Sequence, residues 1–178
     1  MQKMCYVLKY LPLANNGNLS VKVTDGTDAI SDATITLDDD DTETTDSDGE
    51  ATFEDVTAGS HTIKVEKENY VTQTTTVTVA GDTSIDIELV ATRTASFTVN
   101  DGTDAIQGAE LVIDGDTEGK KTTGQAGGCT ATLSDGEHEI VVSAEGYTTK
   151  TETITVDAEH TSFTISLVAE TNTNTEEP

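Results

Sequence analysis

The sequence predicts an all-β protein made of two tandem antiparallel β-sandwiches. Apolar side chains alternate with polar ones along most of the chain, which is the two-residue period of a half-buried strand. Short stretches rich in Gly, Asp and Asn separate these segments, as turns separate short strands. A segment of roughly 75 residues also occurs twice, and such an internal repeat indicates duplicated domains. Helices are not indicated.

The duplication defines the predicted domain organisation. Residues 19–38 align with residues 95–114 at a constant offset of 76, and both copies contain the hexapeptide DGTDAI. The match continues from 61–79 onto 138–156, with small length changes confined to loops. We therefore predict an N-terminal arm, two sandwiches and a flexible polar tail, at residues 1–17, 18–91, 94–169 and 170–178.

Within each repeat, the apolar members of each alternating segment are predicted to share one face and to form the core. Aromatic residues make up only 4 % of the chain, so we expect cores of Val, Ile and Leu. In the first repeat the inward residues are Leu19, Val21, Val23, Ala33, Ile35, Leu37, Ala51, Phe53, Ile63, Val65, Val77, Val79, Ile85, Ile87 and Leu89. In the second they are Phe97, Val99, Leu111, Ile113, Cys129, Ala131, Leu133, Ile140, Val142, Ile154, Val156, Phe163, Ile165 and Leu167.

The shared hexapeptide is predicted to be scaffold rather than a binding site. Asp25-Gly26 follows a predicted strand, where Gly readily takes the positive φ of a tight turn and Asp bonds its own backbone. Ile30 then lies where an apolar side chain closes the end of a sandwich. A second turn has Asn69 in one repeat and Gly146 in the other, the residue types that best tolerate a left-handed conformation. The tyrosine after each is predicted to cap the core edge.

The charge balance excludes some classes of partner. Thirty-four acidic residues against nine basic ones give a formal charge of −25, which repels nucleic acid and anionic membrane surfaces. Cys5 and Cys129 do not make a disulfide framework, since neither repeat has a pair of its own. Cys129 is in phase with the core residues and is predicted to be a small buried hydrophobe.

The strongest candidate site is the acidic run of the first repeat. Carboxylates at this density suit calcium, and the D-x-D-G stretch is a fragment of a calcium-loop pattern. The predicted calcium ligands are Asp38, Asp40, Asp46 and Asp48. The rest of the loop pattern is missing and the second repeat has Gly124–Gly128 in that place, so the alternative is a solvated acidic hairpin that binds no ion. No other cofactor is expected.

The histidines are predicted to be structural. His61 and His138 occupy equivalent positions just before an Ile/Val strand, in phase with buried residues, and no partners at ligand or catalytic spacing accompany them. His160 lies in a polar loop and is expected to be exposed. No nucleophile–base pair and no phosphate-binding glycine loop recurs in both repeats, so we predict that the protein is not an enzyme.

The N-terminal arm is the most apolar stretch outside the repeats. Leaving it in water is unfavourable, so we expect it to be buried as an added strand or in a partner's surface. The predicted anchor residues are Tyr6, Val7, Leu8, Tyr10, Leu11 and Leu13. The arm is too short to insert across a bilayer. The alternative is a degenerate signal sequence ending near Ala14, in which Lys9 and Pro12 interrupt the apolar run.

The first repeat contains, in succession, a predicted strand at 33–37, the turn Thr45–Gly49, Phe53, Gly59 and the pair Asn69-Tyr70. In this succession it resembles the carboxypeptidase regulatory-like and PEGA-like families of β-sandwich modules. It extends more loosely to the second repeat, where TGQAGGCTATL replaces the Asp-rich turn. The resemblance implies seven-stranded, prealbumin-type or immunoglobulin-like sandwiches that serve in display or adhesion, and it says nearly nothing about activity.

Three functions agree with these features. The favoured one is a virion decoration or fibre protein of a tailed phage, on the virion surface and anchored by its arm, because such modules recur in virion proteins. The alternative is an exported cell-surface or filament subunit, present in many copies and assembled by strand complementation. The third is a carbohydrate- or calcium-binding accessory module, for which a chain without Trp offers few aromatic platforms.

Overall fold

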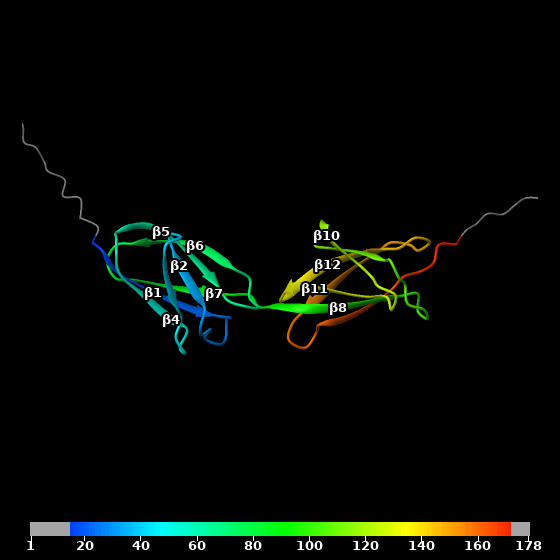
Figure 1. The fold of residues 1–178 in the computed structure, drawn as a ribbon, viewed down its shortest axis with the longest axis horizontal. Coiled ribbons are helices and arrows are strands. Elements are labelled where there is room, and N and C mark those ends of the chain that lie inside the picture. Colours follow the sequence, from blue (N-terminus) through cyan, green and yellow to red (C-terminus); the bar gives the residue numbers. More distant parts are fainter. Residues whose placement is uncertain (1–14, 172–178) are drawn as a thin grey trace, which may run out of the picture. The chain divides into compact units, whose positions relative to one another are not determined.

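The structure is a computed structural model that describes residues 15–171, and all the regular elements of this part of the chain are strands (Figure 1). The described residues divide into two compact units between Leu89 and Val90. Seven strands lie in each unit, which confirms the predicted all-β fold and its two tandem sandwiches. Between residues 15 and 171 no helix is long and apolar enough to cross a membrane.

The first module contains strands β1 to β7. Their bounds are β1 Gly17–Thr24, β2 Thr34–Leu37, β3 Asp41–Thr44, β4 Glu50–Val56, β5 Gly59–Glu66, β6 Gln73–Val79 and β7 Thr83–Glu88. A three-stranded sheet in the order β4-β1-β7 packs against a four-stranded sheet in the order β3-β2-β5-β6. The outer edges of β3 and β4 are therefore unpaired within the module.

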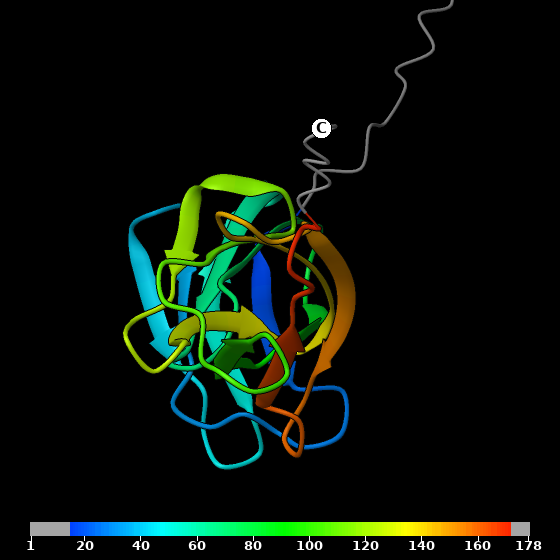
Figure 2. The same ribbon diagram turned by 90° about the vertical axis from the view of Figure 1, so that its right-hand side faces the viewer.

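The second module repeats this arrangement. Its strands are β8 Thr92–Asn100, β9 Glu110–Ile113, β10 Asp116–Thr122, β11 Gly128–Ser134, β12 Gly136–Ser143, β13 Lys150–Val156 and β14 Ser162–Ser166. The sheet orders are β11-β8-β14 and β10-β9-β12-β13. Figure 2 shows the orange-red strand β14 beside the green strand β8.

One strand pair in each module departs from the predicted antiparallel arrangement. Strand β7 runs parallel to β1, and β14 runs parallel to β8. The cause is the odd number of strands. When seven strands alternate in direction, the first and the last point the same way, so they pair in parallel when they become neighbours in one sheet.

The predicted cores are confirmed. Every residue predicted to face inward is buried or half-buried, in two clusters, one for each module. Ile30 closes the end of the first sandwich with only 5 % of its surface exposed, and Ile106 does the same in the second. Tyr70 and Tyr147 are half-buried against the cores, as predicted for caps.

The predicted turns are also confirmed. The Asp25 carboxylate accepts hydrogen bonds from the backbone N–H groups of Thr27 and Asp28 at 3.0 and 2.8 Å, and Gly26 has a φ of 93°. The second copy of the hexapeptide makes the same bonds. Asn69 and Gly146 have φ values of 65° and 81°. These stretches are therefore scaffold, present once in each module.

A buried threonine in each module ties the segment before one strand to the end of the next, as Thr45 after β3 does for the residues before β2. Alternation does not indicate this feature. The Thr45 hydroxyl accepts a hydrogen bond from the Ala33 N–H at 2.9 Å and donates one to the Ile30 carbonyl at 2.7 Å. Thr123 makes the equivalent pair of bonds in the second module. Both side chains are 3 % exposed, so these bonds satisfy backbone groups that water cannot reach.

Some residues outside the predicted sandwich boundaries are bonded into the modules. Gly17 belongs to β1, and the Asn16 side chain bonds Asp55 and the backbone of Ala58. Strand β8 begins at Thr92, and the Arg93 guanidinium makes a two-point contact with the Asp135 carboxylate at 2.6 and 2.9 Å. The first module thus includes residues from the predicted arm, and Thr92 and Arg93, which lie between the two predicted sandwiches, belong to β8.

Candidate functional site: the acidic pocket of the first module

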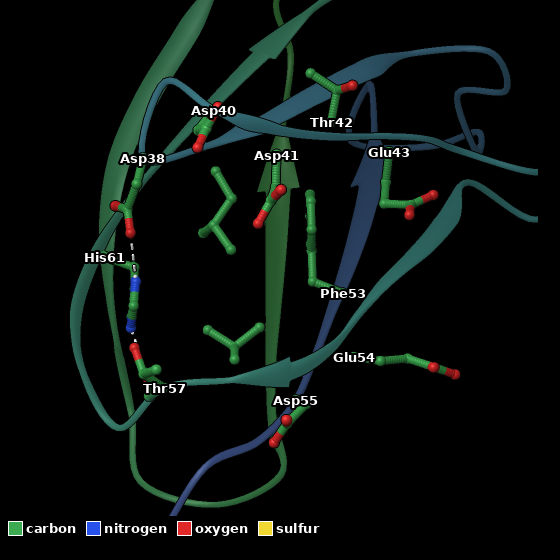
Figure 3. Close-up of a pocket in the computed structure, with 12 residues that line it drawn as sticks. Asp38, Asp40, Asp41, Thr42, Glu43, Phe53, Glu54, Asp55, Thr57 and His61 are labelled. Atoms are coloured by element: carbon green, nitrogen blue, oxygen red, sulfur yellow. Dashed lines mark hydrogen bonds and ion pairs between the residues drawn. The ribbon is translucent and has the colours of Figure 1, made fainter.

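A pocket of about 540 Å³ lies in the first module and is lined by residues of both sheets (Figure 3). It takes in the end of β2, the β2–β3 turn, strand β3, the second half of β4 and the start of β5. The lining contains six carboxylates and neither Lys nor Arg. We call this the acidic pocket; its carboxylates are Asp38, Asp40, Asp41, Glu43, Glu54 and Asp55, and its apolar lining is Leu37, Phe53 and Val56.

Local backbone conformation places these carboxylates at the pocket. Asp38 and Asp39 have φ values of 51° and 63°, so the chain makes a tight turn of two left-handed residues, a conformation that Asp tolerates better than most residues. In β4, Asp55 has a φ of 52°, and the pairing register with β1 shifts between Phe53 and Val56. This β-bulge bends the strand and re-aims the side chain of Asp55.

His61 joins the two sides of the pocket. Its Nδ1 lies 2.6 Å from Asp38 Oδ2, and its Nε2 lies 2.8 Å from the Thr57 carbonyl oxygen (Figure 3). Both partners are acceptors, whereas a neutral imidazole carries only one N–H. With Asp38 ionised, as its lowered pKa favours, the two bonds together require the charged imidazolium. The other Asp38 oxygen accepts the Thr62 N–H at 2.8 Å, so this carboxylate is held at both ends.

The electrostatics of the pair agree with this geometry. The Asp38 carboxylate raises the pKa of His61, helped by the Thr57 carbonyl, and burial opposes the rise only in part. The Thr62 N–H and the His61 side chain hold the pKa of Asp38 below its usual value. We call this unit the His–Asp latch. His61 is 9 % exposed, as predicted for a structural histidine.

The latch limits the chemistry that the acidic pocket can perform. An imidazolium bonded through both nitrogens has no lone pair with which to accept a proton, so His61 is not a general base in this arrangement. The remaining carboxylates are acceptors only when ionised. The pocket therefore repels anions and suits positively charged groups that approach its apolar lining.

The second module keeps the latch but has a different charge pattern around it. His138 lies 2.6 Å from Asp114 and 2.8 Å from the Ser134 carbonyl oxygen. Burial disfavours the charged form of His138, yet the bonds from Asp114 and Ser134 raise its pKa. The pairing registers place Lys121 opposite Leu111, where the first module has Glu43 opposite Ile35. A basic side chain therefore replaces an acidic one at the equivalent position.

The four predicted calcium ligands do not come together in one cluster. Asp38 and Asp40 line the acidic pocket, whereas Asp46 and Asp48 lie outside its lining, in the β3–β4 turn. The Asp46 carboxylate caps that turn by accepting the N–H groups of Asp48 and Glu50, each at 2.9 Å. Between residues 15 and 171, no three His, Cys, Asp or Glu side chains are arranged to hold a metal ion.

Calcium binding at Asp38, Asp40, Asp46 and Asp48 therefore remains a prediction. It is tested by the melting temperature of the first module with and without millimolar calcium. If the ion binds, Asp40→Asn reduces the increase that calcium causes, and the second module, which lacks the acidic turn, melts unchanged.

The other predicted residues fall in two groups. Cys129 is half-buried against the second core, and burial raises the pKa of its thiol, which agrees with a packing role. The anchor residues of the arm lie outside the described residues; they are Tyr6, Val7, Leu8, Tyr10, Leu11 and Leu13. What sequence reasoning missed is the aspartate partner of each buried histidine and the pocket beside the first. The available signal was Asp38 and Asp114, which align at the repeat offset.

Two domain families match the sequence. Residues 18–90 match the family described as carboxypeptidase regulatory-like domain, and residues 105–171 match the PEGA domain family. Both families were predicted from the residues of the repeats, and the matches confirm that prediction. A search of the curated proteins found no match.

The chain is similar to several solved structures. GBS52, the minor pilin of Streptococcus agalactiae, is 14 % identical over 91 % of this chain and 100 % of its own, with a TM-score of 0.50. A streptococcal ancillary pilin is 14 % identical over 87 % of this chain and 62 % of its own, with a TM-score of 0.46. The Bacillus anthracis TIE protein is 16 % identical over 88 % of this chain, with a TM-score of 0.40.

At these identities the likeness concerns the fold alone. The chain spans about a third of the length of the TIE protein and less than two thirds of the ancillary pilin.

Proposed function

From the two matched β-sandwich modules, we propose that this protein is a structural subunit of the cell surface that takes part in a multi-subunit assembly. Its modules act as spacers and display units rather than as catalysts. The finer proposal is assembly by strand addition, in which the N-terminal arm pairs with a neighbouring subunit.

The observation that carries this proposal is the direction of the terminal strands. Because β7 runs parallel to β1, the chain enters the first module at one end and leaves it at the other. The same holds for β8 and β14 in the second module. Modules of this kind extend a chain with each added copy, which suits a surface subunit.

The fold of a minor pilin supports the same choice. The chain aligns with the full length of GBS52, a protein of the pathogen's pili, at a TM-score of 0.50. The charge of −25 keeps such a surface solvated. Because a minor pilin shares this fold over its full length, we propose the exported alternative in place of the virion function that the sequence analysis favours.

The arm supplies the proposed contact between subunits. Polar and apolar side chains do not alternate regularly in residues 6–13, as they would in a strand with one face exposed. The apolar character of this segment favours burial against a sheet edge. The outer edge of β3 offers unpaired backbone groups, and all four of its residues are exposed. Such an edge is the kind that strand addition uses.

Peptide mass spectrometry on fractions of the source culture tests the location. We expect the protein in washed cell envelopes and in surface material released by shearing. Recovery from gradient-purified particles together with capsid and tail proteins, and absence from envelopes, would overturn the proposal in favour of the virion function.

A variant that lacks residues 1–14 tests the role of the arm. The deletion keeps every residue that the structure describes, from Asn15 onward, and so all fourteen strands. We expect a folded, soluble monomer that no longer sediments with the assembly. Normal assembly without these residues would show that the subunits meet elsewhere.

A further inference from the structure

We propose that each module is built to resist a pulling force applied between its two chain ends, and that a ladder between its first and last strands provides the resistance. This mechanical function goes beyond display. It is a property of the isolated protein, so it stands or falls independently of where the protein is located.

The terminal ladder of the first module joins β1 to β7. Residues Leu19–Thr24 pair in parallel with Thr83–Glu88 over six consecutive positions. The inward side chains of both strands belong to the core; Leu19, Val21 and Val23 are at most 1 % exposed. The ladder is thus backed by packed apolar side chains that keep water from its inner face.

Further bonds extend this ladder beyond its paired residues. The Leu89 N–H donates to the Thr24 carbonyl at 2.8 Å, just past one end. At the other end the Asn18 N–H donates to the Asp82 carboxylate at 2.9 Å. The ladder therefore spans the full length of both strands.

The second module has the same device with different residues. Ser96–Asn100 pair in parallel with Ser162–Ser166 over five positions. The Leu167 N–H donates to the Asn100 carbonyl at 2.8 Å, and the Ser166 hydroxyl donates to the Asn100 side-chain oxygen at 2.6 Å. The outward pair Lys22 and Asp86 of the first module is replaced by Thr98 and Thr164 in the second, yet both modules form the same ladder.

Parallel pairing decides how a pulling force acts on these bonds. The force pulls β1 toward its N-terminal end and β7 toward its C-terminal end, and in parallel strands these ends lie at opposite ends of the ladder. The strands must slide past each other, so the evenly spaced bonds are strained together. In an antiparallel pair the two pulled ends would lie side by side, and the bonds would separate one at a time.

The same topology shields the rest of the module. Strands β2 to β6 lie between the end of β1 and the start of β7 in the chain. While the terminal ladder holds, tension passes directly from β1 to β7 and the intervening residues, 25–82, bear none. Failure of the ladder exposes the whole module at once and releases about 250 Å of extended chain.

Single-molecule force spectroscopy on the full chain tests this inference through the pulling direction. In the first geometry handles are attached at the two chain ends. In the second geometry one handle is at the N-terminal end and the other is at a cysteine introduced by Thr57→Cys. Residue 57 lies beside the start of β1, because Gly17 pairs with its neighbour Val56. Both use a Cys5→Ser, Cys129→Ala background, so that only the introduced thiol reacts.

We expect the rupture force for the first module to be several-fold higher between the chain ends than between the N-terminal end and residue 57. Forced unfolding is governed by the unfolding rate in the pulled direction, so one folded state gives two forces. Equal forces in the two geometries would overturn the inference. So would release of chain in several small steps before the main rupture.

A matched pair of variants separates mechanical resistance from stability. Asp82→Ala removes the acceptor of the Asn18 N–H at the end of the terminal ladder, and Asp46→Ala removes the acceptor that caps a turn outside the path of tension. We expect the first to lower the end-to-end rupture force and the second to leave it unchanged, although both lower the melting temperature. A reduction that follows the melting temperature in both variants would contradict the proposed path of tension.

Discussion

The two modules share their scaffold and differ in what surrounds it. Both have the terminal ladder, the buried threonine and the His–Asp latch. They differ in the charge of the segment that begins at the aspartate of the latch and runs through the following hairpin. Residues 38–55 contain ten acidic residues and no basic one, whereas the equivalent residues 114–133 contain three acidic and two basic ones. The repeated features maintain the fold, so the acidic pocket is where the first module has acquired a property of its own.

The cores differ by one layer. In the first module Leu19 pairs with Phe53, whereas the second has two alanines, Ala95 and Ala131, at these positions. One layer further along β8, Phe97 stacks on Phe163 with ring centroids 5.7 Å apart. At the layer of Phe97 and Phe163 the first module has Val21 and Ile85. The bulkiest side chains therefore lie one layer further along the sheet in the second module, and each core has its own shape.

The largest loss of stability is expected from removing one of the stacked rings of this layer. Phe97→Ala should destabilise the second module by about 3–5 kcal/mol, because the ring is 1 % exposed and its removal leaves a cavity against Phe163. The two cores are separate clusters, so the transition of the first module should stay in place. Differential scanning calorimetry measures both transitions, and a shift of both by the same amount would show that the modules unfold as one unit.

A smaller loss of stability, equal in the two modules, is expected from replacing the buried threonines. Thr45→Val keeps the size of the side chain but leaves the Ala33 N–H and the Ile30 carbonyl without their partner, which should destabilise the first module by about 1–3 kcal/mol. Thr123→Val should do the same in the second. Urea unfolding followed by circular dichroism measures both, and Thr→Ser is the control that retains the hydroxyl. Unequal losses would show that the two bonds are not equivalent.

The latch predicts a pH dependence in both modules. The folded state raises the pKa of His61 and His138, so the stabilisation is fully present below the unfolded value of about 6.5 and is lost as pH rises through the folded pKa. The pKa values of Asp38 and Asp114 are lowered, so their contribution is present above about 3.9 and is lost on further acidification.

Melting temperatures between pH 4 and 9 check this dependence. His61→Gln should flatten the decline of the first transition above neutral pH and leave that of the second, which serves as an internal control. His160, exposed and paired with Asp157, is the surface comparison; His160→Gln should change little. If the dependence of melting temperature on pH is unchanged in His61→Gln, the latch is not its source.

The smallest change in stability is expected from exchanging the residue types of Glu43 and Lys121, which differ in charge between the modules. Glu43→Lys gives the first module the residue type of Lys121, reduces repulsion in the acidic pocket, and should stabilise it by about 0.2–1 kcal/mol at low salt. Lys121→Glu should destabilise the second by a similar amount. Thermal melts at low and high ionic strength measure both, since salt screens exposed charges. A gain that persists at high salt would point to packing instead.

Much of the fold could be predicted because it depends on local patterns. Alternation placed Leu19, Ile35 and Phe97 in the cores, and residue type placed Gly26 and Asn69 in turns, because backbone conformation and side-chain period are set by neighbours in sequence. Strand β3 was missed because Asp41–Thr44 is polar and exposed on every residue. An edge strand held by one neighbour needs no apolar face.

The site was harder to predict because its contacts are long-range. Asp38 and His61 are separated by 23 positions in the sequence and meet only when β2 and β5 pair. The parallel pairing of β1 with β7 is likewise set by strand number and sheet order, not by any local signal. Strand β3 separates Asp38 and Asp40 from Asp46 and Asp48, and the Asp38 carboxylate bonds Thr62 of β5 while that of Asp46 caps the β3–β4 turn.

The odd number of strands also bears on how such a protein arises. In such a module the two chain termini lie at opposite ends of the sandwich. A second copy can therefore follow the last strand by simple extension of the gene, with no strand to thread and no earlier contact to break. An even number of alternating strands would return the chain to its starting end, and a second copy would compete there for space. Duplication followed by local change of charge is therefore an easy evolutionary path for this architecture, and further copies meet no topological obstacle.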